Sequence, residues 1–204
     1  ILKSGINIKL YPVCYAIHRA LDAVIDMRAR TPINADEIEA IDLEIGETQA
    51  EILRVHRPTN GLDAKISGEF AMASAIVAGA CGHSELTDSF VNRRDVQDLI
   101  GKVRIRTTPE KDDHEPAHSP FDRVSLTMRG GGTLTTEAVT RPRGHFQRGI
   151  ETDKLWAKFE DCTKPVLGER GARTLFDAIQ GLERVSSVAD FAVFPSDKRQ
   201  VNAA

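Results

Sequence analysis

Hydrophobic side chains near the start of the chain recur at intervals of three and four residues. Between Val13 and Arg30 they fall on one face, which predicts an amphipathic helix. Pro12 suits the first turn of that helix, because a backbone N–H there would have no helical partner. Residues 38–45 (IEAIDLEI) instead alternate over their second half between apolar and acidic side chains, and this alternation predicts a strand with one solvated face.

Helical patterns return in the middle of the chain. A polar stretch at residues 57–65 contains Pro, Asn and Gly and predicts a loop. After it, Ser67 is placed to cap a helix that runs to Gly79. Asn92 is expected to cap a shorter helix over residues 93–103, whose apolar side chains share one face.

Loop and hairpin signals follow. Residues 109–120 contain three prolines and no large apolar side chain, so they predict an exposed loop. Two segments of strand pattern, residues 122–129 and 133–139, flank the glycines at 130–132. This arrangement predicts a hairpin, because glycines adopt the turn conformations that other residues resist.

The pattern changes at residues 141–149, which are basic and loop-like, and beyond them only helical patterns remain. We therefore divide the chain into an α+β domain at residues 1–147, with a small, mostly antiparallel sheet packed on helices, and a helical tail at residues 148–204. Two amphipathic helices bury little apolar surface by themselves, so the tail is expected to pack on another domain or on a second copy. The apolar tail residues expected to be buried in this way are Leu155, Trp156, Phe159, Leu175, Ile179 and Leu182.

Composition excludes several classes of function. A formal net charge of −3 gives no strongly basic surface, so we expect no nucleic-acid partner. No apolar run reaches the roughly 18 residues of a membrane span, so we expect no membrane partner. The cysteines at positions 14, 81 and 162 lie far apart and are odd in number, which favours a reducing compartment over a disulfide framework. We therefore expect a cytoplasmic protein.

A series of short motifs gives a more specific signal. The string K-x-Y-P-x-C-x-x-x-H runs from Lys9 to His18 and is followed by Asp22 and Ala23. Four further motifs follow in order: A-K-x-S-x-x-F at 64–70, V-N-R-R-D-V-x-x-L at 91–99, R-P-R-G at 141–144 and K-F at 158–159. Together they resemble the C-terminal half of MmgE/PrpD proteins, a family that includes 2-methylcitrate dehydratase, cis-aconitate decarboxylase and iminodisuccinate epimerase.

The resemblance implies an architecture and a chemistry. Residues 1–147 would be a lid domain, and residues 148–204 would return into an otherwise absent all-helical domain. About half of a family-length protein would then be missing, which agrees with a chain that starts at Ile1 rather than Met. The family's chemistry would be proton abstraction next to a carboxylate, followed by dehydration, decarboxylation or epimerisation of a small di- or tricarboxylic acid. The resemblance also implies a homodimer that needs no metal or other cofactor.

Lys9 matches the family's lysine, which reaches from the lid towards the substrate. An ammonium group has three donors and can stabilise the charge that builds up when a proton next to a carboxylate is removed. We therefore expect Lys9 to be catalytic, the alternative being a solvated lysine at a strand end. Ser67 and Phe70 would form a wall of the cleft that holds the substrate. The family has a tyrosine where this chain has Phe70, and a phenyl ring cannot donate a proton, so Phe70 either shapes the wall or belongs to the core.

Other polar residues leave alternatives open. His18 stands four residues before Asp22, so the Asp22 carboxylate can fix the tautomer of the His18 imidazole in a substrate-binding site. The alternative is a histidine that packs at a helix–sheet junction. Glu69 can do acid or base work if it is buried, and otherwise lies on a helix surface. Pairs such as Cys14 with His18 have two-ligand metal spacing but no further ligands, so we expect no metal site.

The basic residues Arg141, Arg143, His145 and Arg148 either attract an anionic substrate or solvate an interdomain linker. The general base would come from outside this chain, so the chain by itself is expected to be inactive. Two alternatives to an enzyme part remain. One is a non-catalytic binding or assembly module that keeps the family fold, and the other is an unrelated α+β ligand-binding domain.

Overall fold

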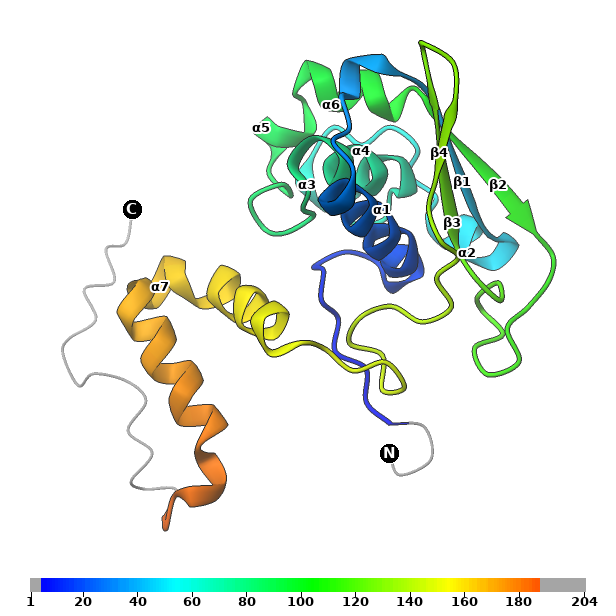
Figure 1. The fold of residues 1–204 in the computed structure, drawn as a ribbon. Coiled ribbons are helices and arrows are strands. Elements are labelled where there is room, and N and C mark those ends of the chain that lie inside the picture. Colours follow the sequence, from blue (N-terminus) through cyan, green and yellow to red (C-terminus); the bar gives the residue numbers. More distant parts are fainter. Residues whose placement is uncertain (1–4, 188–204) are drawn as a thin grey trace. The chain divides into compact units, whose positions relative to one another are not determined.

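The computed structural model describes residues 5–187 of the chain. The chain divides into two compact units, Ile1–Lys154 and Leu155–Ala204. The first unit combines a four-stranded sheet with helices (Figure 1), so the predicted α+β class is confirmed. The functional boundary expected near residue 147 stays a prediction. No helix within the described residues is long and apolar enough to cross a membrane.

The sheet has the strand order β2-β1-β3-β4. Its strands are β1 (Ile38–Gly46), β2 (Val103–Thr108), β3 (Arg123–Met128) and β4 (Thr133–Thr135). β1 pairs parallel with β2 and antiparallel with β3, and β3 pairs antiparallel with β4. Two of the three pairings are therefore antiparallel, and the predicted hairpin is the β3–β4 pair.

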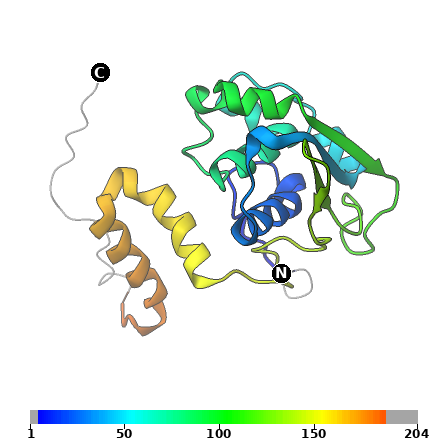
Figure 2. The same ribbon diagram turned by 45° about the horizontal axis from the view of Figure 1, so that its top comes forward.

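Three helices of the first unit cover one face of the sheet (Figures 1 and 2). They are α1 (His18–Arg30), which follows a 3-10 turn at Tyr15–Ile17, α4 (Gly68–Ala78) and α6 (Arg94–Ile100). Leu43 stands opposite Ile105 on one neighbouring strand and Val124 on the other, which places an apolar row in the centre of the sheet. α1 packs against both α4 and β3, so the core lies between the sheet and these helices.

The prediction for α4 is confirmed at both ends. The Oγ of Ser67 accepts a hydrogen bond from the N–H of Phe70 at 3.1 Å, so Ser67 caps the helix start. Gly79 ends the helix with φ +70°, a conformation that other residues adopt only at a cost.

The prediction for Asn92 is wrong. Its side-chain amide donates to the backbone oxygens of Thr59 and Asp88, so it ends α5 (Asp88–Val91) rather than capping the start of the next helix. α6 ends at Ile100, and Val103 belongs to β2. The alternation of β2 is too short to separate it from the preceding helical pattern, and its pairing with β1 decides the conformation.

Two short helices occupy segments without a clear helical pattern. α2 (Glu47–Ile52) follows β1 directly. α3 (Gly61–Ala64) lies within the stretch predicted as a loop, where the Oδ1 of Asn60 accepts hydrogen bonds from the N–H groups of Leu62 and Asp63. A single capped turn of this kind has too few residues to show a periodic pattern.

In the second unit, α7 (Thr152–Gln180) continues from the first and is followed by a 3-10 turn at Leu182–Arg184. Non-helical angles at Gly168 divide α7 into two helical segments, which correspond to the two predicted tail helices. Trp156, Phe159 and Phe176 pack together, with the Phe176 ring centroid 5.1 and 5.3 Å from the other two.

The expected burial of the apolar tail residues against another domain or a second copy stays a prediction, and within the single chain part of this apolar surface is exposed. Val166, Ile179 and Leu182 are 83, 42 and 48% exposed. Leu155, Trp156, Phe159 and Leu175 are only partly buried. The contacts between the two helical segments of α7 include the aromatic cluster of Trp156, Phe159 and Phe176.

Candidate active-site wall

The segment that carries Lys9 is held on both sides by backbone hydrogen bonds. The N–H of Ile8 donates to the oxygen of Gly144 at 2.8 Å, and the N–H of Cys14 donates to the oxygen of Lys65 at 2.8 Å. Lys9 itself is exposed and has no ion-pair partner in the described part of the chain. Its ammonium group is therefore accessible to a ligand and sits on an anchored backbone.

Gly144 makes this anchoring possible. Its φ of +81° lies in the left-handed region, and a Cβ at this position would collide with the backbone oxygen of Ile8. Glycine alone allows the two backbones to approach so closely. Gly144, the last residue of the R-P-R-G motif, therefore has a structural role: it holds the segment that contains Lys9 in place.

The two arginine side chains of the R-P-R-G motif form ion pairs with aspartates of this chain. Arg141 makes two hydrogen bonds to Asp112, at 2.7 and 2.9 Å. Arg143 pairs with Asp22 at 3.1 Å and with Asp26 at 2.5 Å. Both arginine side chains are largely buried, so they neither form a basic rim for a substrate nor solvate a linker.

Asp22 joins the first motif to the R-P-R-G motif. It is fully buried and accepts hydrogen bonds from the hydroxyl of Tyr11 at 2.7 Å and from the backbone N–H of Arg143 at 2.6 Å. Burial, followed by the negative charge of Asp22, raises the pKa of Tyr11. The tyrosine therefore stays protonated and acts as a permanent donor to this carboxylate.

His18 is buried between two aromatic rings. Its ring centroid lies 5.2 Å from those of Tyr11 and Tyr15, and its Nε2 lies 3.4 Å from the backbone oxygen of Val13. In the single chain no surface of His18 is open to a ligand. The structure shows His18 packed against the two tyrosine rings, and the substrate-binding role expected for it stays a prediction.

A buried arginine that sequence patterns missed lies beside this region. Arg19 is 1% exposed, donates to Glu115 at 2.9 Å and donates to the backbone oxygen of Ser119 at 2.6 Å. These bonds fasten the loop at residues 109–120 to α1, so part of that loop is buried, contrary to the prediction. The one available signal was the position of Arg19 among small residues of the helix, Ala16, Ala20 and Ala23.

Asp122 completes the buried cluster. The Nε2 of Gln49 lies 3.1 Å from both of its carboxylate oxygens, and the Oγ of Ser119 donates to it at 3.1 Å. Burial raises the pKa of Asp122 to about 7, against the opposing effect of Arg19. Burial likewise lowers the pKa of His118, and the positive charge of Arg19 adds to this shift.

The start of α4 brings a second set of polar groups together. Ser67 and Phe70 are buried, and the Phe70 ring packs edge-on against Phe90, so Phe70 lies in the core of the single chain. Glu69 is also buried, at 6% exposure, which excludes the expected alternative of a helix-surface glutamate. Its Oε1 lies 2.7 Å from the Nδ1 of the exposed His56, a residue that sequence patterns did not single out.

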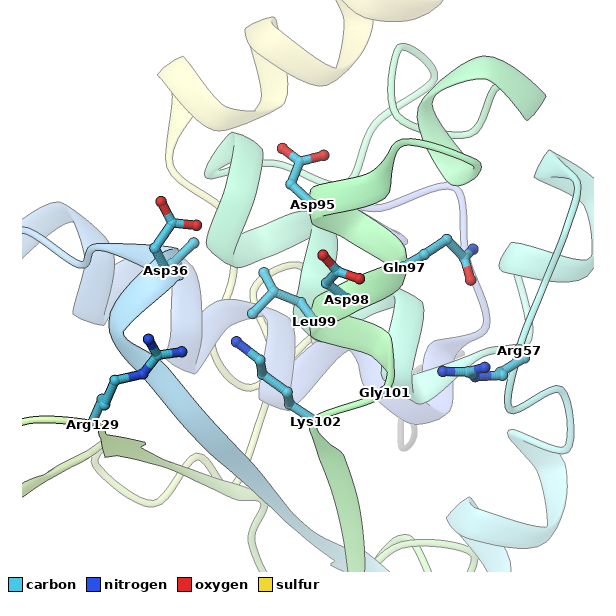
Figure 3. Close-up of a pocket in the computed structure, with 10 residues that line it drawn as sticks. Asp36, Arg57, Asp95, Gln97, Asp98, Leu99, Gly101, Lys102 and Arg129 are labelled. Carbon is cyan, nitrogen blue, oxygen red and sulfur yellow. The ribbon is translucent and has the colours of Figure 1, made fainter.

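A separate open pocket of about 580 Å³ lies beside α6 and the two residues that follow it, and Asp36, Arg57 and Arg129 also line it (Figure 3). It mixes cationic Arg57, Lys102 and Arg129 with acidic Asp95 and Asp98. The ammonium of Lys102 already donates to the backbone oxygen of Ile38 at 2.6 Å. None of the predicted site residues lines this pocket. Within residues 5–187 no three His, Cys, Asp or Glu side chains are grouped so that they could hold a metal ion.

The region of this chain that matches a known protein family contains most of these motifs. A family model for the MmgE/PrpD C-terminal domain matches residues 11–184. The chain belongs to the MmgE/PrpD C-terminal domain family. This range contains Asp22, Ser67, Phe70 and the R-P-R-G motif, whereas Lys9 lies two residues before it.

Similar curated proteins are cis-aconitate decarboxylases. The mouse protein is 25% identical over 190 residues, which cover 89% of this chain and 37% of the relative. An Aspergillus terreus protein is 23% identical over 194 residues, covering 90 and 39%. The human protein is 23% identical over 189 residues, covering 89 and 38%. The MmgE/PrpD chain described here thus spans less than two fifths of the length of these relatives.

Proposed function

We propose that this chain is the lid-bearing part of an enzyme that acts on a small di- or tricarboxylic acid by proton abstraction next to a carboxylate. Membership of the MmgE/PrpD family and the similarity to cis-aconitate decarboxylases support this proposal. The names of these relatives favour decarboxylation over dehydration or epimerisation. The spacing of the cysteines supports a cytoplasmic site of action.

The observation that carries the proposal is the contrast between Lys9 and the nearby arginines. Arg141 and Arg143 are neutralised by internal carboxylates, whereas Lys9 is exposed and unpaired in the described part of the chain. In the proposed mechanism the Lys9 ammonium binds a substrate carboxylate and stabilises the negative charge that develops beside it. Ser67 fixes the start of α4, and Phe70 fills the core beneath it.

The general base would come from outside the chain, so the 204-residue chain by itself should be inactive. The assay therefore uses the full natural polypeptide that contains this chain. It is incubated with cis-aconitate, citrate and 2-methylcitrate, and CO₂ release and loss of substrate signals are followed by NMR. We expect turnover of at least one acid.

Lys9→Ala should lower kcat/KM by at least about 100-fold, because it removes an electrostatic contact made in the transition state. The matched control is Lys111→Ala, which removes an exposed lysine of the loop at residues 109–120 and should leave kcat/KM unchanged. The absence of turnover for every acid would refute the proposal. So would a folded Lys9→Ala variant with full activity.

A second candidate function is a non-catalytic binding or assembly module. The burial of Phe70, at a position where the family's tyrosine would carry a hydroxyl, favours this alternative. It predicts that the full polypeptide binds a polycarboxylate in calorimetry and turns over none.

A further inference from the structure

His56 and Glu69 form a pair at the start of α4. A β-bridge between Arg54 and Ser67, and a hydrogen bond from the N–H of Val55 to the oxygen of Ile66 at 3.3 Å, place the segment of His56 beside this helix end. The Nδ1 of His56 then lies 2.7 Å from the Oε1 of Glu69. The His56 side chain is 67% exposed, whereas that of Glu69 is 8% exposed.

The buried carboxyl group of Glu69 has a second polar neighbour besides His56. A buried carboxylate is costly unless it is hydrogen-bonded, and the Oε2 of Glu69 lies 3.4 Å from the Oγ of Ser67. Glu69 also stands in the first turn of α4, where the helix dipole stabilises a negative charge. The fold therefore directs one oxygen of this buried carboxyl group at an exposed imidazole.

This contact sets the chemistry of His56. A carboxylate at Nδ1 keeps the proton on that nitrogen, which leaves Nε2 as an acceptor in the neutral ring and as a donor in the charged ring. Nε2 of His56 makes no hydrogen bond within the part of the chain that the structure describes. The exposed ring can therefore exchange a proton with a ligand or with water through Nε2.

The segments of His56 and of Lys9 are both joined by backbone hydrogen bonds to residues 65–67. Residues 65–67 are contacted from one side by Cys14, through the oxygen of Lys65, and from the other by Arg54 and Val55. Glu69 directly precedes Phe70, which is buried and has no hydroxyl. Position 70 thus presents no hydroxyl, and the exposed proton-carrying group next to this helix start is the imidazole of His56.

We propose that His56, oriented by Glu69, is the group that transfers a proton to the substrate. The inference rests on the proposed function. In a decarboxylation, the C–C bond to one carboxylate breaks, CO₂ leaves, and the bonding electron pair stays on the substrate. The His56 imidazolium donates its Nε2 proton to the substrate carbon that takes up this pair, and the neutral ring then takes a proton from water. One proton is consumed for each CO₂ released.

The kinetic test uses the full natural polypeptide with cis-aconitate. His56→Gln should lower kcat by about 100- to 10,000-fold, the range for loss of a general acid, with KM changed only a few-fold. The decrease of kcat with rising pH that reports the loss of a required proton should disappear. Glu69→Gln should give a smaller loss of kcat, because the His56 imidazole remains but loses the carboxylate that orients it. His114→Gln, an exposed histidine of the loop at residues 109–120, is the control and should keep wild-type kinetics.

A spectroscopic test uses the 204-residue chain with ¹⁵N-labelled histidine. Wild-type His56 should show the tautomer with its proton on Nδ1, and Glu69→Gln should shift it towards the mixture found in free imidazole. Thermal melts of all variants identify any that fail to fold. If His56→Gln does not fold, the loss of kcat in Glu69→Gln together with its change of His56 tautomer decides the question.

The outcomes separate the two proposals. If the wild type turns over cis-aconitate and Lys9→Ala impairs it, but folded His56→Gln keeps the wild-type kcat and pH profile, the role of His56 is refuted and the proposed function stands. If the wild type turns over no acid, both fail. If the tautomer of His56 does not respond to Glu69→Gln, Glu69 is not its positioning residue.

Discussion

Arg143 reaches across 121 residues of sequence to make two hydrogen bonds with Asp22. Its backbone N–H donates to Oδ2 at 2.6 Å and its Nη1 donates to Oδ1 at 3.1 Å. Tyr11 donates to the same carboxylate at 2.7 Å. The K-x-Y-P motif, α1 and the R-P-R-G motif are thereby one buried network, which holds the backbone on either side of Lys9.

Asp22→Asn should lower the free energy of unfolding by about 3 kcal/mol, because it removes the buried negative charge that Arg143 and Arg148 share and leaves Arg143 with the more exposed Asp26. Urea denaturation of the chain measures this effect. Asp42→Asn removes the partner of the exposed Arg106 and should cost less than about 1 kcal/mol. Equal losses in the two variants would show that the Asp22 network contributes no more than a surface pair.

Gly144→Ala should destabilise the chain more than Gly131→Ala. Both glycines have positive φ, at +81° and +85°, so both substitutions carry a backbone cost of about 1–2 kcal/mol. Only at Gly144 would the new Cβ also collide with Ile8, whereas nothing lies within 4 Å at Gly131. Gly144→Ala should also speed hydrogen exchange at the Ile8 amide. Similar unfolding free energies and unchanged exchange would contradict the close approach.

Asp122 should make stability fall as the pH rises. Its carboxyl has an ordinary pKa of 3.8 and a folded-state pKa of about 7. Between these values the folded chain holds a proton that the unfolded chain has released, so the free energy of unfolding decreases by up to about 1.4 kcal/mol per pH unit and levels off above pH 7.

Asp122→Asn removes this contribution. Relative to the wild type, it should therefore be more stable at pH 8 than at pH 4.5, as measured by urea denaturation at each pH. Asp113→Asn, an exposed carboxyl of the nearby loop, is the control and should show a constant difference. Parallel pH profiles for Asp122→Asn and the wild type would contradict a protonated Asp122 in the folded state.

The exposed apolar side chains of the second unit should drive association. Val166, Ile179 and Leu182 are each exposed in the single chain, which leaves their apolar side chains in water. We expect the chain to form a homodimer whose population rises with concentration, as measured by light scattering. Replacing Ile179 and Leu182 with Ser should shift the equilibrium to monomer. A wild-type chain that is monomeric at high concentration would contradict this expectation.

Local patterns were enough to predict much of the fold. The alternation around Leu43, the cap at Ser67 and the glycines of the β3–β4 turn act through neighbouring residues, so each leaves a signal in a short window of sequence. The motif at Lys9 predicted a catalytic lysine, which stays a prediction, and the structure shows that Lys9 is exposed on an anchored segment. β2 was missed because its six residues acquire their conformation from pairing with β1.

The polar interior was decided only by the tertiary structure. Arg19 and Asp122 are charged residues that a local pattern assigns to the surface, yet each is buried because a partner from a distant segment satisfies it. Glu69 had two possible environments in the sequence, and in the structure it is buried and contacts His56, which the Arg54–Ser67 bridge brings near. The sequence determines which groups can donate, accept or carry charge. Which of them meet depends on contacts between residues far apart in the chain, and the spacing of residues within a motif carries no information about those contacts.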